Sequence, residues 1–140
     1  MTEEETRNVD ILRDGYARWS DSKAGSAAHW MSLMVDDVHW CSLGAGGAGQ
    51  EFTGACFNKQ GVLSYFEALG AEWELVAYDA DEFVAQGDRV VMLGRCHWRN
   101  RRTGKEVNSP KADVLRMRDG KIVAFMEYYD TAQAAAAAAQ

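Results

Sequence analysis

The chain has 140 residues, of which 47% are hydrophobic and 26% charged, as in one ordinary globular domain. Its formal net charge of −6 leaves a single short basic cluster, at 99–105, so we expect no nucleic-acid partner. The three cysteines lack CxxC spacing and the three histidines are scattered, so we expect reduced thiols and no metal site.

The N-terminus predicts two amphipathic helices. Thr2 and Glu5 have the spacing of a capping box, and apolar residues then recur at helical intervals to about Ser20. After a break at 22–26, a second apolar stripe covers 27–34. The acidic start differs from the basic start of a signal peptide, and no apolar run is long enough to span a bilayer. We therefore expect a cytoplasmic protein with no membrane partner.

A short strand, a glycine-rich loop and a third helix are expected next. The strand covers 38–43, the loop covers 44–49, and the helix begins after Asn58 as its cap and ends at Gly70. The loop satisfies G-x-G-x-x-G, but no helix opens there and no strand-plus-acid unit follows. We therefore expect a mobile rim of a cavity and no dinucleotide site.

From Trp73 onward, runs rich in Val, Phe, Tyr and Trp predict four antiparallel strands. Turn residues at 87–88, 103–104 and 119–120 separate these runs, and Pro110 predicts a bulge or bend inside the third. Helices followed by a meander of strands indicate an α+β fold.

The chain divides into one domain and a short tail. The domain is expected to cover 1–132. The alanine-rich segment 133–140 lacks apolar periodicity, and we expect it to be a frayed tail.

The end of the domain carries the most specific sequence signal. Residues 118–130, RDGKIVAFMEYYD, resemble the closing hairpin of SnoaL-like proteins within the nuclear-transport-factor-2-like superfamily. Three other segments follow in the order found in these proteins: residues 16–19, the two aspartates at 36–37 and the turn at 103–105. The resemblance covers nearly the whole chain. It implies a cone-shaped, strongly bent antiparallel sheet wrapped around about three N-terminal helices and enclosing a pocket.

Two residues match the oxyanion hole of ketosteroid isomerase, a member of this superfamily. Tyr16 matches the tyrosine that donates to the developing oxyanion, and Asp113 matches its protonated aspartate. Ketosteroid isomerase is itself the known example of an apolar site that keeps a carboxylic acid neutral. Its general base, however, falls at Ser42, and a serine cannot shuttle a proton between carbon atoms.

Limonene epoxide hydrolase, a second member, gives a different comparison. Its last strand carries a Trp two residues before a water-activating Asp, and Phe125 and Glu127 stand at these positions. It also needs an Arg and a second Asp on the long middle strand, where Arg95 and His97 are the nearest candidates. The sequence leaves open which of Arg95, Cys96 and His97 face the pocket.

Alternation along the last strand places Phe125, Glu127 and Tyr129 on one face. Glu127 is then an isolated carboxylate among aromatic side chains. We expect His97 and Glu127 to converge inside the cone as an acid–base centre oriented by Arg95. The alternative is that Glu127 forms a satisfied interior ion pair with Arg95 or His97.

These residues predict a protein that acts on a small, largely apolar molecule by general acid–base chemistry without a cofactor, as an isomerase, a cyclase or an epoxide hydrolase does. The predicted catalytic residues are Glu127, His97, Asp113 and Tyr16. The predicted ligand contacts are Arg95, Trp40, Ser42, Phe125, Tyr129 and Trp19.

The alternative is a non-catalytic binding module or a dimeric scaffold of the same fold. We also expect a homodimer, because large apolar residues on the outward sheet face are unfavourable in water. The residues predicted to form this face are Cys96, Trp98, Val114, Met126 and Tyr128.

Overall fold

The computed structural model describes all 140 residues. The elements follow in the order α1 (Glu3–Asp21), α2 (Ala27–Ser32), β1 (Met34–Ser42), η1 (Glu51–Thr53), α3 (Lys59–Glu72), β2 (Trp73–Gln86), β3 (Arg89–Asn100), β4 (Glu106–Arg118), β5 (Lys121–Tyr128) and α4 (Thr131–Ala138). The predicted α+β fold is confirmed. None of the helices is both long and apolar enough to cross a membrane.

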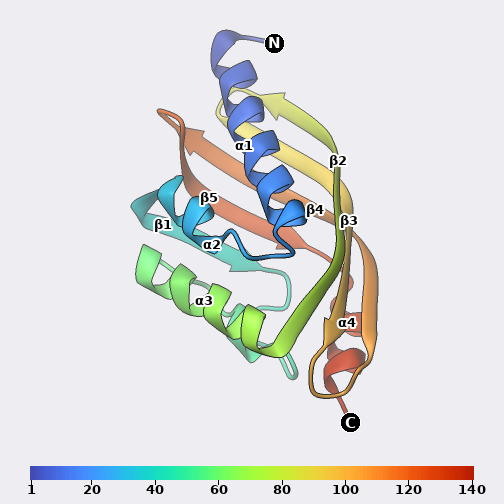
Figure 1. Cartoon of the computed structure of the whole chain (residues 1–140). Coiled ribbons are helices and arrows are strands. Elements are labelled where there is room, and N and C mark those ends of the chain that lie inside the picture. The colour runs from blue at the N-terminus through green and yellow to red at the C-terminus, as the bar shows by residue number, and fades with distance from the viewer.

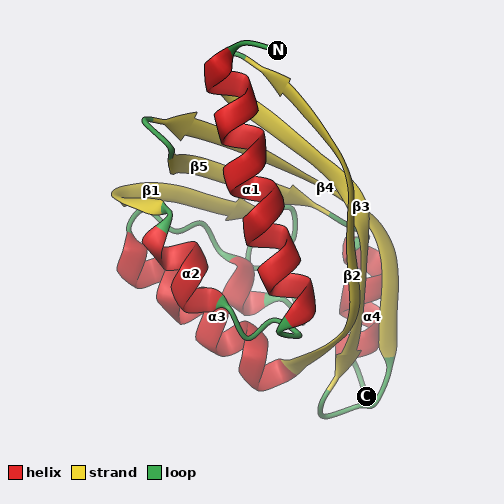
Figure 2. Ribbon diagram, turned by 45° about the horizontal axis from the view of Figure 1, so that its top comes forward, coloured by secondary structure: helices red, strands yellow, loops and turns green.

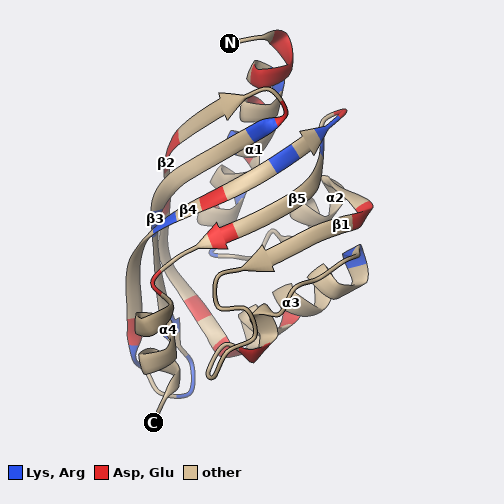
Figure 3. Ribbon diagram, turned by 180° about the vertical axis from the view of Figure 1, so that it is seen from behind, with Lys and Arg blue, Asp and Glu red and all other residues tan.

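The five strands form one open, strongly curved sheet in the order β1-β5-β4-β3-β2 (Figure 1). Strands β2 to β5 form the predicted antiparallel meander. Strand β1 differs, because it pairs with β5 in parallel and makes the sheet mixed. Helices α1, α2 and α3 lie on the concave face (Figure 2), and in the view from behind α1 and α2 lie beyond the sheet (Figure 3).

Helix α1 forms where the capping box predicted it. The Glu5 amide donates to Thr2 Oγ1 at 3.1 Å, and the Thr2 amide donates to Glu5 Oε1 at 2.7 Å. Its apolar stripe, including Leu12 and Tyr16, is buried against the concave face. Full burial of one such side chain contributes about 1.5–3 kcal/mol, so packing fixes the helix on the sheet.

Helix α3 also begins at its predicted cap, because Asn58 Oδ1 accepts a hydrogen bond from the Gly61 amide at 2.9 Å. Helix α2 is shorter than expected, and β1 starts earlier, at Met34. Met34 pairs with Ile122 of β5 before an irregularity in the register, and this pairing takes the residue from the helix.

The register of β3 decides which side chains enter the interior. Val90, Met92 and Cys96 are buried, whereas Arg95 is exposed on the outer face. The predicted outer face was therefore wrong for Cys96 and Trp98, which line the interior. The irregularity expected at Pro110 occurs instead between Arg116 and Met117, in the pairing of β4 with β5.

The alanine-rich segment is a packed helix and not the frayed tail that we expected. Asp130 caps α4 by accepting from the Gln133 amide at 2.9 Å, and Ala134, Ala137 and Ala138 are buried. Alanine has the highest intrinsic helix propensity. The expectation failed because a helix that buries methyl groups needs no stripe of large apolar residues.

Candidate functional site

A cavity lies between the concave face of the sheet and the helices. Of its 21 lining residues, 16 are hydrophobic, and the centres of water-sized spheres can occupy about 100 Å³ of it. Because one such sphere needs roughly 10–15 Å³, the space suits a small organic molecule. The aromatic lining residues are Tyr16, Trp19, Trp30, Trp40, Phe52, Tyr65, Phe66, Trp73, Tyr78, Trp98, Phe125 and Tyr129.

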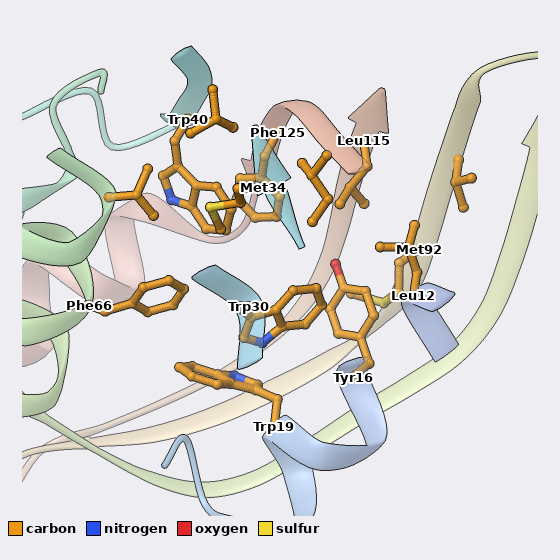
Figure 4. Packing of buried hydrophobic residues seen from close by; sticks show 14 of the residues in the cluster. Leu12, Tyr16, Trp19, Trp30, Met34, Trp40, Phe66, Met92, Leu115 and Phe125 are labelled. Carbon is orange, nitrogen blue, oxygen red and sulfur yellow. The ribbon is translucent and has the colours of Figure 1, made fainter. Parts of the chain in front are cut away.

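Aromatic side chains from helices and strands pack edge to face and face to face around this space. Figure 4 shows Trp40 of β1 stacked on Phe125 of β5, with ring centroids 3.7 Å apart and planes 12° apart. On the opposite wall, Tyr16 and Trp30 meet edge to face at 5.0 Å. Such pairs hold flat apolar surfaces in fixed places around the cavity.

Three ionisable side chains face each other inside this apolar wall. Asp113 of β4 and Glu127 of β5 are direct cross-strand partners. Lys111 precedes Asp113 by two residues and therefore projects from the same face of β4. Its Nζ lies 3.2 Å from Asp113 Oδ1 and 3.1 Å from Glu127 Oε2, and all three side chains are buried. One ammonium thus joins two carboxyl groups.

Glu127 is surrounded by hydrogen-bond donors. Ser42 Oγ donates to its Oε1 at 2.5 Å, and the Tyr65 hydroxyl donates to the same oxygen at 2.7 Å. Lys111 Nζ donates to its Oε2 at 3.1 Å. Donors on both carboxyl oxygens therefore hold Glu127 in one orientation.

Asp113 has a different environment. Its Oδ2 accepts from the Tyr16 hydroxyl at 2.6 Å and from the Tyr78 hydroxyl at 3.4 Å. Its buried Oδ1 accepts no hydrogen bond. Lys111 Nζ contacts this oxygen only as an ion pair. Burial raises the pKa of Asp113 above its usual value, although the Lys111 charge opposes the shift. Asp113 is therefore suited to hold a proton.

Lys111 remains an ammonium in this environment. Burial by itself would lower its pKa, but Asp113, Tyr78 and Glu127 together raise that pKa well above its ordinary value. The ammonium also lies 5.3 Å from the centre of the Tyr78 ring, a favourable cation–π distance. Lys111 therefore serves as a fixed positive charge and not as an amine nucleophile.

The structure brings most of the sequence-predicted residues to this cavity. Tyr16 and Asp113 are hydrogen-bonded to each other, and Glu127 stands opposite Asp113. Ser42 lies beside Glu127 as its hydrogen-bond donor. The predicted ligand contacts that line the cavity are Trp19, Trp40, Phe125 and Tyr129.

The predicted pair of His97 and Glu127 is wrong. His97 Nε2 lies 2.6 Å from Glu106 Oε1 near the outer surface, and Arg95 bonds Asn108 Oδ1 at 3.2 Å. Neither His97 nor Arg95 lines the cavity. The prediction failed because the even-numbered residues of β3 face inward, whereas Arg95 and His97 are odd-numbered.

Sequence reasoning missed Lys111, Tyr65 and Tyr78. A signal for Lys111 was present, because strand alternation from Asp113 puts positions 107–117 of odd number on one face. The cation and second carboxylate that we looked for on β3 thus stand on β4. Tyr65 and Tyr78 carried no comparable signal, since a tyrosine in an apolar stripe reads as core packing.

The glycine-rich loop supports one side of the cavity. The Gly46 amide donates to Thr53 Oγ1 at 3.1 Å, and the Tyr129 hydroxyl donates to Gln50 Oε1 at 2.5 Å. A Cβ on Gly44 would come within 2.5 Å of the Tyr129 hydroxyl, so that position has no room for a side chain. Burial, followed by the Glu127 charge, raises the pKa of Tyr129 to about 12.

No group of three or more His, Cys, Asp or Glu side chains is arranged to hold a metal ion.

Solved structures share this architecture. An NTF2-like protein from Burkholderia thailandensis E264 is 30% identical, with a TM-score of 0.80 over 95% of this chain and 98% of that chain. TerC, co-crystallised with polyporic acid, is 23% identical, with a TM-score of 0.76 over 94% and 98%. A protein from Catenulispora acidiphila DSM 44928 with a ketosteroid-isomerase-like fold, in complex with trimethylamine, is 16% identical, with a TM-score of 0.73 over 91% of each chain.

The last two similarities show the fold alone, and no curated protein matches the sequence. The family model of the SnoaL-like domain matches residues 12–125, which is most of the chain. The predicted resemblance is thereby confirmed, and the chain belongs to the SnoaL-like domain family.

Proposed function

We propose that this protein is an enzyme that acts on a small, largely apolar molecule by acid–base chemistry without a cofactor, and that its reaction is the opening of an epoxide by water. The observation that carries the proposal is the contact of one buried ammonium, Lys111, with two carboxyl groups inside an aromatic cavity. Asp113 is buried with a raised pKa, whereas Glu127 accepts hydrogen bonds at both oxygens, so the two groups can divide the roles of acid and base.

The proposed reaction uses both carboxyl groups at once. Glu127 takes a proton from a water molecule as the water oxygen forms a bond to a ring carbon. Asp113 gives its proton to the epoxide oxygen as the carbon–oxygen bond breaks, so the product is a diol. After the reaction, Glu127 loses its proton to water and Asp113 takes one from water, while the Lys111 ammonium stays in contact with both groups.

Two further observations favour hydration over isomerisation. Ser42 stands where the ketosteroid isomerase base would lie, and it donates its hydroxyl to Glu127. The cation two residues before Asp113, with Glu127 opposite, supplies the set that limonene epoxide hydrolase implies, with Lys for Arg and Glu for Asp. Tyr16, which donates to Asp113, orients the acid.

A non-catalytic binding module remains a second candidate for one specific reason. Both oxygens of Glu127 already accept hydrogen bonds, from Ser42, Tyr65 and Lys111. A water molecule must therefore share or displace one of these donors before Glu127 can activate it. The relatives solved with polyporic acid and with trimethylamine support a small-molecule pocket in either case.

The test measures hydration of cyclohexene oxide, with isomerisation of 3-cyclohexenone as the competing reaction. We expect diol formation, and a loss of about 10²–10⁴-fold in Glu127→Gln and in Asp113→Asn, while calorimetry still detects the bound epoxide. Glu106→Gln, which removes a carboxylate on the outer side of the same sheet, is the matched control and should keep full activity. If wild-type protein binds both compounds and converts neither, the proposed enzymatic activity is contradicted and the non-catalytic binding module is supported.

A further inference from the structure

We propose that α4 is a hinged section of the cavity wall, and that its transient opening is the route by which a ligand reaches Asp113 and Glu127. The proposal concerns access to the cavity, and it holds whether or not the bound molecule is converted. It assigns a role to the alanine-rich segment, which the acid–base chemistry does not use.

The acid–base groups are almost wholly buried in the structure. Asp113 is 1% exposed and Glu127 is 8% exposed, and the side chain of Lys111 is 8% exposed. Little of each group can therefore be reached from outside, and movement of part of the wall would expose more of all three.

Helix α4 forms the wall where the sheet is incomplete. Strand β5 ends at Tyr128, and α4 then lies beside the lower half of β4 in place of a strand (Figure 3). The Asp130 amide donates to Ser109 Oγ at 3.0 Å, and the Asn108 amide donates to Gln133 Oε1 at 2.5 Å. On the inner side, Ala134 lines the cavity.

The packing of α4 is weak compared with that of the other helices. Its buried side chains are alanines, and they pack in a small cluster with Trp73 and Val107 that is separate from the main core. A buried alanine removes one methyl group from water, a fraction of what leucine or tryptophan removes. Segments with little buried apolar surface open locally at lower free energy than the rest of a fold.

The C-terminal end of α4 is held by polar contacts from the turn between β3 and β4. Thr103 Oγ1 donates to the Ala137 carbonyl at 2.5 Å, and Lys105 Nζ donates to the Ala139 carbonyl at 2.7 Å. Arg102 donates to the Ala138 carbonyl. We call these three residues the clasp. The clasp satisfies carbonyls that a helix leaves unpaired, and solvent can take over each contact when the helix moves.

The buried thiol of Cys96 provides a test that needs no ligand. Cys96 lines the cavity, whereas Cys41 and Cys56 do not. In a Cys41→Ser/Cys56→Ser background, N-ethylmaleimide therefore reacts with Cys96 only when the cavity opens. The labelling rate then measures the population of the open state, independently of any catalytic activity.

We expect Thr103→Val and Lys105→Met, each made in that background, to raise the labelling rate about two- to tenfold, the effect of losing one hydrogen bond. Lys121→Met is the matched control, because Lys121 Nζ donates to the Ser32 carbonyl at 2.9 Å away from α4. Its labelling rate should not change. Equal rates in all of these proteins would overturn the proposal, as would a rate no faster than global unfolding measured in urea.

Discussion

Lys111 determines how two buried acids coexist in one cavity. Its ammonium is within 3.2 Å of Asp113 and 3.1 Å of Glu127. Without it, the two carboxyl groups would face each other in an aromatic environment with no opposite charge, and removal of one partner from a buried ion pair is costly.

We therefore expect Lys111→Met to lower the free energy of unfolding by about 3–5 kcal/mol at pH 7. The deficit should shrink at pH 5, because protonation of a carboxyl group removes the unpaired charge. Urea denaturation at both pH values is the measurement. A deficit that is the same at both would contradict this account, and Lys111→Met/Glu127→Gln should recover part of the loss at pH 7.

Asp113 gives a second prediction at the same scale. Its pKa in the folded state is raised above the ordinary value of 3.8, chiefly by burial. Between that value and the raised one, the folded state binds more protons than the unfolded state, so stability falls as pH rises. Asp113→Asn removes this dependence, and the stability of the variant relative to wild type should increase from pH 4 upward. Parallel stability curves for the two proteins in urea would show that the acid is not perturbed.

At the scale of the elements, two glycines should respond in opposite directions to the same substitution. A Cβ on Gly94 of β3 would overlap the carbonyl of Asp79 on β2, whereas Gly70 in α3 has no heavy atom within 4 Å of its Cβ position. We expect Gly94→Ala to cost about 1–3 kcal/mol by forcing β2 away. Gly70→Ala should add about 0.4–1 kcal/mol by restricting the unfolded chain. Urea denaturation of both variants tests the pair, and an unaffected Gly94→Ala would mean that β2 yields at no cost.

The elements themselves could be predicted because their signals are local. The capping box at Thr2 and the cap at Asn58 define helix starts in the sequence, and turn residues separate β2 to β5. The parallel pairing of β1 with β5 could not be predicted, because it depends on a contact between distant segments. Which residues of β3 face the interior could not be predicted for a similar reason. Alternation is compatible with either face until one residue is known to be buried.

The part of the site that could be predicted consists of residues that stand out individually in the sequence. Tyr16, Asp113 and Glu127 stand out as polar groups in apolar runs, and they do meet in the cavity. Lys111 was overlooked because a lysine on a strand is ordinarily exposed. Only the curvature of the sheet, which closes the cavity over β4, turns this lysine into an interior charge.

At the scale of the whole molecule, the outer face of the sheet carries an apolar row. Val84, Val91, Val114 and Met126 are successive cross-strand neighbours on β2, β3, β4 and β5. Val84, at the end of this row on the edge strand β2, is 50% exposed and leaves apolar surface in water.

We expect this face to pair with a second copy of the chain. Light scattering at micromolar concentration should give twice the mass of one chain for wild type, and Met126→Lys should give the mass of one chain, because a charge would be buried without a partner. Gln86→Lys, at the exposed end of β2, is a control that should leave the mass unchanged. A single-chain mass for wild type would contradict the prediction.

The aromatic lining of the cavity has an optical consequence. The chain contains five tryptophans, and Trp19, Trp30, Trp40, Trp73 and Trp98 all line the same space. Indole emission depends on the polarity and the packing of its surroundings, so the intrinsic fluorescence of this protein reports almost wholly on one location. A molecule that enters the cavity alters the environment of every fluorophore that dominates the spectrum. Unlabelled protein can therefore be titrated with a library of compounds, and a change in its own emission identifies those that reach the interior.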